Sequence, residues 1–211
     1  MSAFSAQSQI VFTVGVVGGQ NYTEPLLDWN TGIERQTTSG ANEIHFGVTG
    51  KARLYEQLHF RTDIFYKDTK SAFGADYRVG QEGWTANAVL EQQTINLMFA
   101  PQLHFLPKGA AYVFGGLLIE MNRNSDFTYG QFIQPGDITP VVVDFKDDEA
   151  QNNNAPAAVV GLGLNPKFGR VGIFGEVRYS RSKFTAVHPL LPRIGQENIA
   201  VSLGLTYDLN E

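Results

Sequence analysis

The chain has 211 residues, a formal net charge of -5 and no cysteine. Its length suits one domain, and no Pro/Gly/Ser-rich linker divides it, so we expect a single domain over residues 10–211. The lack of cysteine excludes disulfides and Cys-based zinc sites, and the lack of a Lys/Arg cluster argues against a nucleic-acid partner. No run of about 18 apolar residues occurs, which excludes a helical membrane protein. Residues 1–9 are mostly small and polar, and we interpret them as a signal-peptide remnant or an N-terminal tail.

The first three expected strands, 10–17, 43–54 and 58–67, alternate apolar and polar residues. A period of two is that of a β-strand whose two faces meet different surroundings. A tight turn near residue 56 joins the second and third strands. Their polar faces carry a dense set of charged and imidazole side chains: Glu43, His45, Lys51, Arg53, His59, Arg61, Asp63 and Lys67.

Five further strands are expected at 94–103, 111–122, 158–164, 171–180 and 198–209. The strand at 111–122 is apolar on both faces, and we place Val113 and Leu117 outward because this turns Glu120 and Asn122 inward. The last strand alternates most regularly. Its apolar face carries Ile199, Val201, Leu203, Leu205, Tyr207 and Leu209, opposite small or polar residues.

The connections are short near residues 56, 107 and 167, and long near 30, 78, 140 and 189. Tight turns on one rim and long loops on the other are typical of bacterial outer-membrane barrels. We therefore predict an all-β fold: an eight-stranded antiparallel up-and-down transmembrane β-barrel with short periplasmic turns and long extracellular loops. The longest loop, 123–157, contains a hairpin signal in which 127–134 and 138–145 flank a Pro-Gly-Asp turn. If that hairpin joined the wall, the barrel would have ten strands.

The alternative fold is a soluble lipocalin-like barrel, in which the apolar face fills the interior. Three features favour the membrane barrel. The polar face is rich in glycine and alanine, which suits a narrow, filled lumen better than a strand facing water. Aromatic residues lie near strand ends, as in interfacial girdles, and one rim is tight while the other is elaborate.

With the polar face inside, charged side chains must share the lumen of the barrel. Buried charges have to pair, because an isolated ion out of water costs several kcal/mol. Eight strands leave room only for side chains, so we predict a salt-bridged plug and no open pore. The predicted lumen network consists of Glu43, Lys51, Arg53, Arg61, Asp63, Glu176, Arg178 and Asp208.

The segment Gly161–Ser182, with Glu176-Val177-Arg178-Tyr179-Ser180 at its centre, and the closing strand Ile199–Leu209 resemble the last hairpin and final strand of the broad "outer membrane protein β-barrel domain" families, which include the PorT-like barrels. The eight-strand plan is also similar to that of the OmpA and OmpX barrels. The resemblance implies an integral protein of the bacterial outer membrane, surrounded by membrane lipid including lipopolysaccharide. It carries no catalytic residue to this chain.

Aromatic residues of the expected loops are candidate partner-binding residues, because Trp and Tyr supply contact area at low entropic cost. An equally open interpretation is that they pack the loops together or mark the outer lipid interface. The residues are Tyr22, Trp29, Tyr77, Trp84, Phe127, Tyr129 and Phe132.

Motifs for catalysis or cofactors are absent from the sequence, which contains no GxSxG, HExxH or phosphate-binding glycine loop. His45 and His59 lie near Asp63 and Glu43 in the expected lumen. The same pattern arises when the polar side chains inside a barrel simply hydrogen-bond to one another. The acidic run from Asp144 to Glu149 lacks the spacing of a calcium loop. We expect no catalytic residue, metal or cofactor.

The predicted function is that of a non-enzymatic outer-membrane barrel whose loops serve recognition, adhesion or assembly with an envelope or surface protein. Two alternatives remain at this point. One is an outer-membrane enzyme acting on lipid, for which His45 and His59 would be essential. The other is a soluble lipocalin-like carrier.

Overall fold

The computed structural model describes residues 10–28, 33–79, 82–106, 110–133, 155–182, 185–186 and 193–210. The secondary structure of these residues consists of strands and turns. The strands are β1 (Val11–Asp28), β2 (Ile33–Ser39), β3 (Ala41–Arg53), β4 (Leu58–Val79), β5 (Glu82–Phe105), β6 (Ala111–Ile133), β7 (Ala155–Leu164), β8 (Lys167–Phe168), β9 (Val171–Ser182), β10 (Thr185–Ala186) and β11 (Arg193–Asp208).

Eight of these strands close into an antiparallel barrel in the order β1-β3-β4-β5-β6-β7-β9-β11. Closure is made by β1 and β11, which pair from Thr13 opposite Asp208 to Asp28 opposite Arg193. The short strands β2, β8 and β10 pair with β4, β9 and β11, respectively, and are not counted among the strands of the barrel wall. The eight-stranded prediction is therefore confirmed. Residues 138–145, the second strand of the hairpin that would have given ten strands, lie outside the described residues.

The apolar face of each barrel strand points outward, as predicted. Ile44 is 70% exposed, Leu162 62% and Leu203 68%, whereas Arg61, Met98 and Tyr112 are fully buried. The ambiguous strand β6 follows the same rule, because Val113 and Leu117 are exposed while Glu120 is buried. A lipocalin-like carrier needs the opposite arrangement, so that alternative is wrong.

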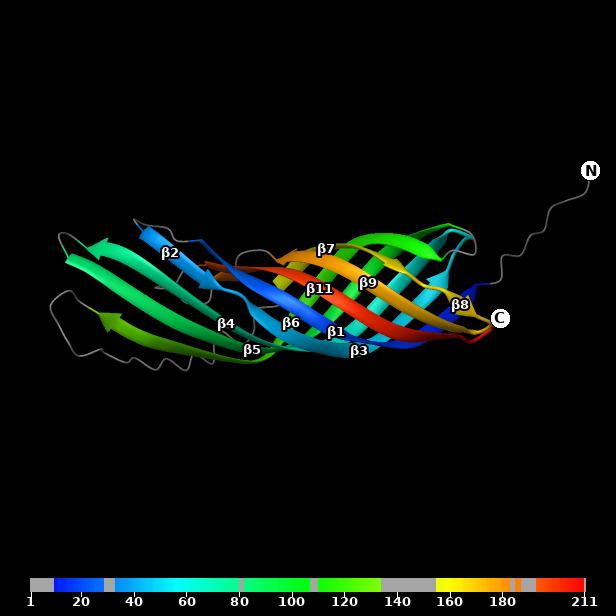
Figure 1. Cartoon of the computed structure of the whole chain (residues 1–211), viewed down its shortest axis with the longest axis horizontal. Coiled ribbons are helices and arrows are strands. Elements are labelled where there is room, and N and C mark those ends of the chain that lie inside the picture. The colour runs from blue at the N-terminus through cyan, green and yellow to red at the C-terminus, as the bar shows by residue number, and fades with distance from the viewer. Residues whose placement is uncertain are drawn as a thin grey trace, which may run out of the picture.

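Many residues that we expected in the long loops instead continue the strands. The long connection expected near residue 78 is strand on both sides of residues 80–81, and β6 runs on to Ile133. Figure 1 shows β4, β5 and β6 continuing well past the barrel, at the end opposite β8. We call residues 68–79, 82–93 and 121–133 of these strands the extension; β2 pairs with its β4 side.

Tight turns form the other rim, as predicted. In the first turn, the amides of Leu54 and Tyr55 donate to the Leu58 carbonyl at 2.9 and 3.1 Å. The other two turns contain residues with left-handed backbone conformations, Leu106 at φ 69° and Gly169 at φ 63°. Glycine accepts this conformation at little cost, so the tight reversal at Gly169 suits its residue. In outer-membrane barrels the rim with tight turns is the periplasmic one; here we call it the tight-turn rim.

Candidate functional site

The centre of the lumen holds a buried network around Arg61, which lies on β4. Its guanidinium donates to both Asp63 oxygens at 2.7 and 2.6 Å and to both Glu176 oxygens, the latter from β9 across the barrel. The Tyr112 hydroxyl donates to Glu176 at 2.7 Å. Arg61 and Asp63 are fully buried. Bidentate, charge-assisted bonds of this kind are the strongest hydrogen bonds available to side chains.

Two other predicted network cations, Lys51 and Arg178, rest on aromatic rings. The Lys51 Nζ lies 4.7 Å from the Phe174 ring centroid and 5.3 Å from that of Tyr112. The Arg178 Cζ lies 4.2 Å from the Phe65 centroid. Neither the Lys51 Nζ nor the two terminal nitrogens of Arg178 have a hydrogen-bond partner among the described residues. Attraction to the ring faces replaces part of the lost hydration.

Nearer the extension, the predicted residue Glu43 joins a second polar cluster. Its carboxylate lies 3.6 Å from the Lys67 Nζ and accepts hydrogen bonds from Thr23 and Thr69 at 2.8 and 3.2 Å. Lys67 also donates to Asn198 at 2.9 Å. This cluster ties β1, β3, β4 and β11 together at one level of the lumen.

The remaining predicted network residues, Asp208 and Arg53, lie toward the tight-turn rim. Asp208 accepts hydrogen bonds from Thr13 at 2.6 Å and from Lys167 at 2.5 Å. Arg53 is half-buried and lines a cavity at that rim. The eight predicted lumen residues thus occupy several levels of the barrel, and the structure joins only Arg61, Asp63 and Glu176 directly to one another.

Aromatic rings opposite glycines fill the space between the charged groups. A Cβ atom added at Gly161 would lie 2.4 Å from the Phe114 ring, and one at Gly204 would lie 2.3 Å from the Phe174 ring. Tyr112 approaches Gly163 in the same way. The glycines of the polar face are therefore the places into which large inward rings pack, and this leaves the central lumen filled.

The two candidate histidines lie apart. His45 is fully buried, contacts the Ser202 hydroxyl at 2.9 Å and packs edge-on against Phe65. His59 stacks on His104 near the tight-turn rim, with ring centroids 3.9 Å apart. Among the described residues, no group of three or more His, Cys, Asp or Glu side chains is arranged to hold a metal ion.

The candidate aromatic residues are mostly on strands. Tyr22 lies on β1 and is 43% exposed, while Trp29 lies outside the described residues. The strand register pairs Tyr77 with Trp84 and brings Phe132, Tyr129 and Phe127 opposite Ala86, Ala88 and Leu90 of β5. Directly paired residues share a sheet face, and so do alternate residues of one strand. Five of the candidates therefore belong to one face of the extension, which continues the lumen face of β5.

The outer surface of the barrel carries an apolar band that ends at charged residues. On β11 the outward residues are apolar from Ile199 to Leu209, and Glu197 follows Ile199 on the same face. At about 3.3 Å per residue and a tilt of roughly 40°, this stretch spans about 25 Å of height, the apolar thickness of outer-membrane barrels.

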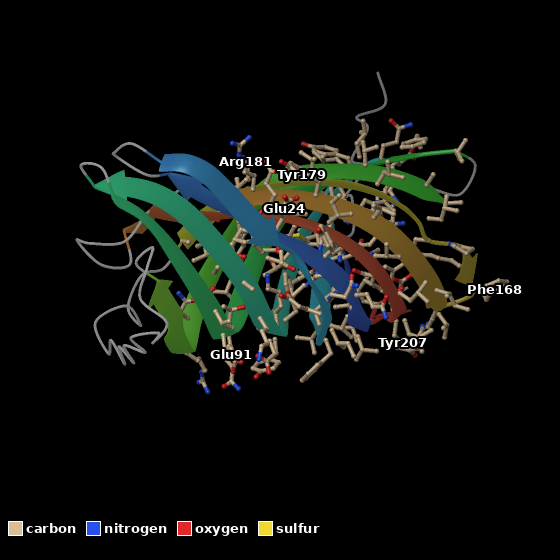
Figure 2. All side chains as sticks on the ribbon, turned by 60° about the vertical axis from the view of Figure 1, so that its left-hand side comes forward. Glu24, Glu91, Phe168, Tyr179, Arg181 and Tyr207 are labelled. Atoms are coloured by element: carbon tan, nitrogen blue, oxygen red, sulfur yellow. The ribbon has the colours of Figure 1, made fainter. Side chains whose placement is uncertain are left out.

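The limits of the band are visible from outside the wall. Figure 2 shows Tyr207 and Phe168 toward the tight-turn end, and Glu91 and Arg181 toward the extension. Two ion pairs lie at this end of the band. Arg181 pairs with Glu197 at 3.4 Å, and Lys70 pairs with Glu91 at 2.5 Å. Exposed ion pairs of this kind belong in water or among headgroups, so the membrane ends below the extension.

No helix in the described parts of the chain is long and apolar enough to cross a membrane. No protein-family model and no curated protein matches the sequence.

Solved structures similar to this chain are barrels of outer-membrane and surface proteins. Neisserial surface protein A is 9% identical, with a TM-score of 0.47 over 94% of this chain and 97% of the other. Ail, the attachment invasion locus protein of Yersinia pestis, is 9% identical, with a TM-score of 0.47 over 92% and 98%. AlkL, an outer membrane protein determined in lipid bilayers, is 16% identical, with a TM-score of 0.45 over 100% and 96%.

At such values the similarities add nothing to the architecture that the strands themselves establish. A closed eight-stranded wall, an apolar band of membrane height and a polar interior with paired charges meet the physical requirements of spanning a bilayer with strands. The protein is an eight-stranded transmembrane β-barrel.

Proposed function

We propose that the protein is a non-enzymatic scaffold that uses its barrel to hold the extension outside the cell, where the extension binds an envelope or surface protein. The observation that carries this proposal is the strand register, which gathers Tyr77, Trp84, Phe127, Tyr129 and Phe132 on one face of the extension. Aromatic residues dominate protein-binding surfaces because they bury large areas while fixing few rotatable bonds.

The polarity of the sheet faces supports a role outside the membrane. In the barrel the outward face is apolar, but in the extension the outward positions include Asp68, Lys70, Asp76, Arg78 and Asn87. The aromatic positions lie on the opposite face, so they do not belong to a lipid-facing girdle. An aromatic face above the bilayer is suited to contact with protein.

The filled lumen favours the function of a scaffold and argues against that of a transport channel. The Arg61 network crosses the barrel from β4 to β9, and the Phe114, Phe174 and Tyr112 rings occupy the space around it. Eight-stranded barrels of this kind hold side chains and leave no aqueous channel. The rigid wall then serves to anchor and orient the extension.

Photo-crosslinking in intact cells of the producing bacterium tests the proposal. A benzophenone amino acid replaces Trp84 or Tyr129 one at a time, and the control replaces Tyr55, which is 70% exposed on a periplasmic turn. We expect a discrete protein adduct from positions 84 and 129, and its loss when Tyr77 is also changed to Ser. Heat-dependent mobility on SDS gels verifies that each variant forms a folded barrel. The proposal fails if folded variants give no adduct from the extension, or the same adduct from position 55.

A further inference from the structure

The ladder between β5 and β6 contains two β-bulges, and the first lies at the base of the extension. There the consecutive β5 residues Gln93 and Thr94 pair with Asn124 and Asn122, so Arg123 is an extra residue on β6. Nearer the tip, another β6 residue is left out in the same way. The ladders between all other neighbouring strands of the barrel wall run without a register shift. A bulge leaves the extra residue unpaired and shifts the register beyond it.

The bulge at Arg123 decides which face the aromatic positions of β6 occupy. In the observed register, which we call the bulged register, Phe127 lies opposite Leu90 and Tyr129 opposite Ala88. Both partners are on the face of β5 that continues the lumen. In a ladder without the bulge, the regular register, the two aromatic residues would instead lie opposite positions 89 and 87. A shift by one residue moves every side chain of a strand to the other face, so both would point outward.

The outer part of β6 has few constraints on its register. Its ladder with β7 ends at Glu120, and beyond that point it pairs with β5 alone among the described strands. It lies at one edge of the extension (Figure 1). Polar residues occur on both of its faces, such as Ser125 on one and Asp126 on the other. The register of a strand with polar residues on both faces is weakly specified, because no buried face holds it.

The bulged register carries costs as well as gains. It leaves Arg123 without ladder partners and places Asp126 directly opposite Glu91. Like charges in a cross-strand pair are destabilising, although Lys70 also bonds to Glu91 and weakens the repulsion. The regular register removes both costs, but it places Asp126 opposite Leu90 and separates the aromatic positions. Individual cross-strand pairs are weak, so the two registers differ little in free energy.

We propose that the outer part of β6 moves between these two registers and that the movement switches the binding face of the extension. In the bulged register, Phe127 and Tyr129 share a face with Tyr77 and Trp84, and the aromatic surface is complete. In the regular register the aromatic positions are divided between the two faces of the sheet. A partner that binds only the complete surface draws β6 into the bulged register. The existence of two registers does not depend on a partner, whereas the use assigned to them rests on the proposed function.

Pairs of introduced cysteines trap each register, because the chain has no cysteine of its own. Thr128→Cys lies opposite Val89 in the bulged register and opposite Ala88 in the regular one. In either register the alternative position is on the opposite face of the sheet, where a disulfide is unable to form. The full chain in lipid vesicles carries Thr128→Cys with Val89→Cys or with Ala88→Cys, and disulfide formation under mild oxidation is followed on gels. We expect both pairs to close, the Val89→Cys pair faster.

Deletion of Arg123 is the variant that separates the two registers. Without the extra residue, a regular ladder keeps Phe127 opposite Leu90, and the alternative register would itself need a bulge. The deletion should therefore slow closure of the Ala88→Cys/Thr128→Cys pair about tenfold or more. Arg123→Ser keeps the extra residue and should leave the rate unchanged. The proposal is overturned if the Ala88→Cys pair stays reduced, or if the deletion does not slow its closure; heat-dependent gel mobility verifies folding of every variant.

Photo-crosslinking from position 84 tests the use of the switch. With the Val89→Cys/Thr128→Cys disulfide closed, we expect the protein adduct to form as in the chain without the cysteines. With the Ala88→Cys/Thr128→Cys disulfide closed, we expect about tenfold less adduct, restored by reduction. Equal adduct from both trapped forms would overturn the switch. If both registers are trapped but no form of the chain gives an adduct, the proposed function fails and the two registers remain.

Discussion

Three strands of the barrel, β4, β5 and β6, continue into the extension, yet the polarity of their two faces is opposite in the two regions. Within the barrel the outward residues of β5 are apolar, such as Leu97 and Leu103, and the inward residues include the polar Thr94, Asn96 and Gln102. In the extension, which contains residues 82–93 of β5, the outward positions include Glu91 and Asn87. Trp84 lies at a position on the opposite face, which continues the lumen face of the barrel. The outward residues of a single strand thus change from apolar to polar where its surroundings change from hydrocarbon to water.

Replacing Arg61 with Met is the change with the largest expected effect on this comparison. It leaves Asp63 and Glu176 buried without their partner, which costs about 3–5 kcal/mol. The matched change in the extension is Lys70→Met, on the same strand, which breaks an exposed ion pair and costs less than about 1 kcal/mol. Urea unfolding in lipid vesicles measures both. Equal losses would mean that the barrel interior is not the low-dielectric site described here.

A lipid-facing charge is expected to have the next largest effect. Leu203 is 68% exposed in the middle of the apolar band, so Leu203→Arg places a cation in hydrocarbon and costs about 2–4 kcal/mol. Val89→Arg introduces the same charge on the outward face of the extension, where we expect a change within about 0.5 kcal/mol. Folding free energies in vesicles distinguish them. A well-tolerated Leu203→Arg would contradict the position of the membrane.

A single methyl group tests the two faces of the barrel wall. In Gly47→Ala the new Cβ lies 2.1 Å from the Ile64 carbonyl oxygen, inside the wall, so neighbouring backbone must move at a cost of about 1–3 kcal/mol. In Gly50→Ala, on the opposite face of the same strand, the nearest atom is the Thr62 carbonyl oxygen at 3.8 Å. That variant should fold with wild-type stability. Similar midpoints in urea would show that the interior is less tightly packed than described.

The alternation of side chains was sufficient to predict the wall of the barrel. A period of two, together with tight turns near 56, 107 and 167, fixed the number of strands and which face points outward, even for β6, where Glu120 and Asn122 decided the orientation. The extension was missed because its polarity inverts. Once Asp68 and Lys70 appear on the outward face, and Gly74, Gly80 and Gly83 follow, the segment has the composition of a loop.

The charged residues of the lumen were predicted as a group, but their partners were only partly predictable. Arg61 and Asp63 are two residues apart on one strand face, so their contact follows from the sequence. The bonds from Arg61 and Tyr112 to Glu176 cross the barrel between strands that are not neighbours, and these depend on closure and tilt. The positions of Lys51 over Phe174 and Arg178 over Phe65 depend on glycines elsewhere in the wall that make room for the rings.

The most direct test of the account is a spin-label scan along β5, the strand that crosses from the barrel into the extension; the chain has no native cysteine to remove. Single cysteines from 84 to 103 carry the label in lipid vesicles, and collision rates with oxygen and with a water-soluble nickel complex are measured. We expect the odd positions from 95 to 103 to be oxygen-accessible, and the odd positions from 85 to 91 to be nickel-accessible. Oxygen accessibility at the even positions of 96–102, or a lipid-exposed stretch in 85–91, would contradict the inversion of polarity at the membrane boundary.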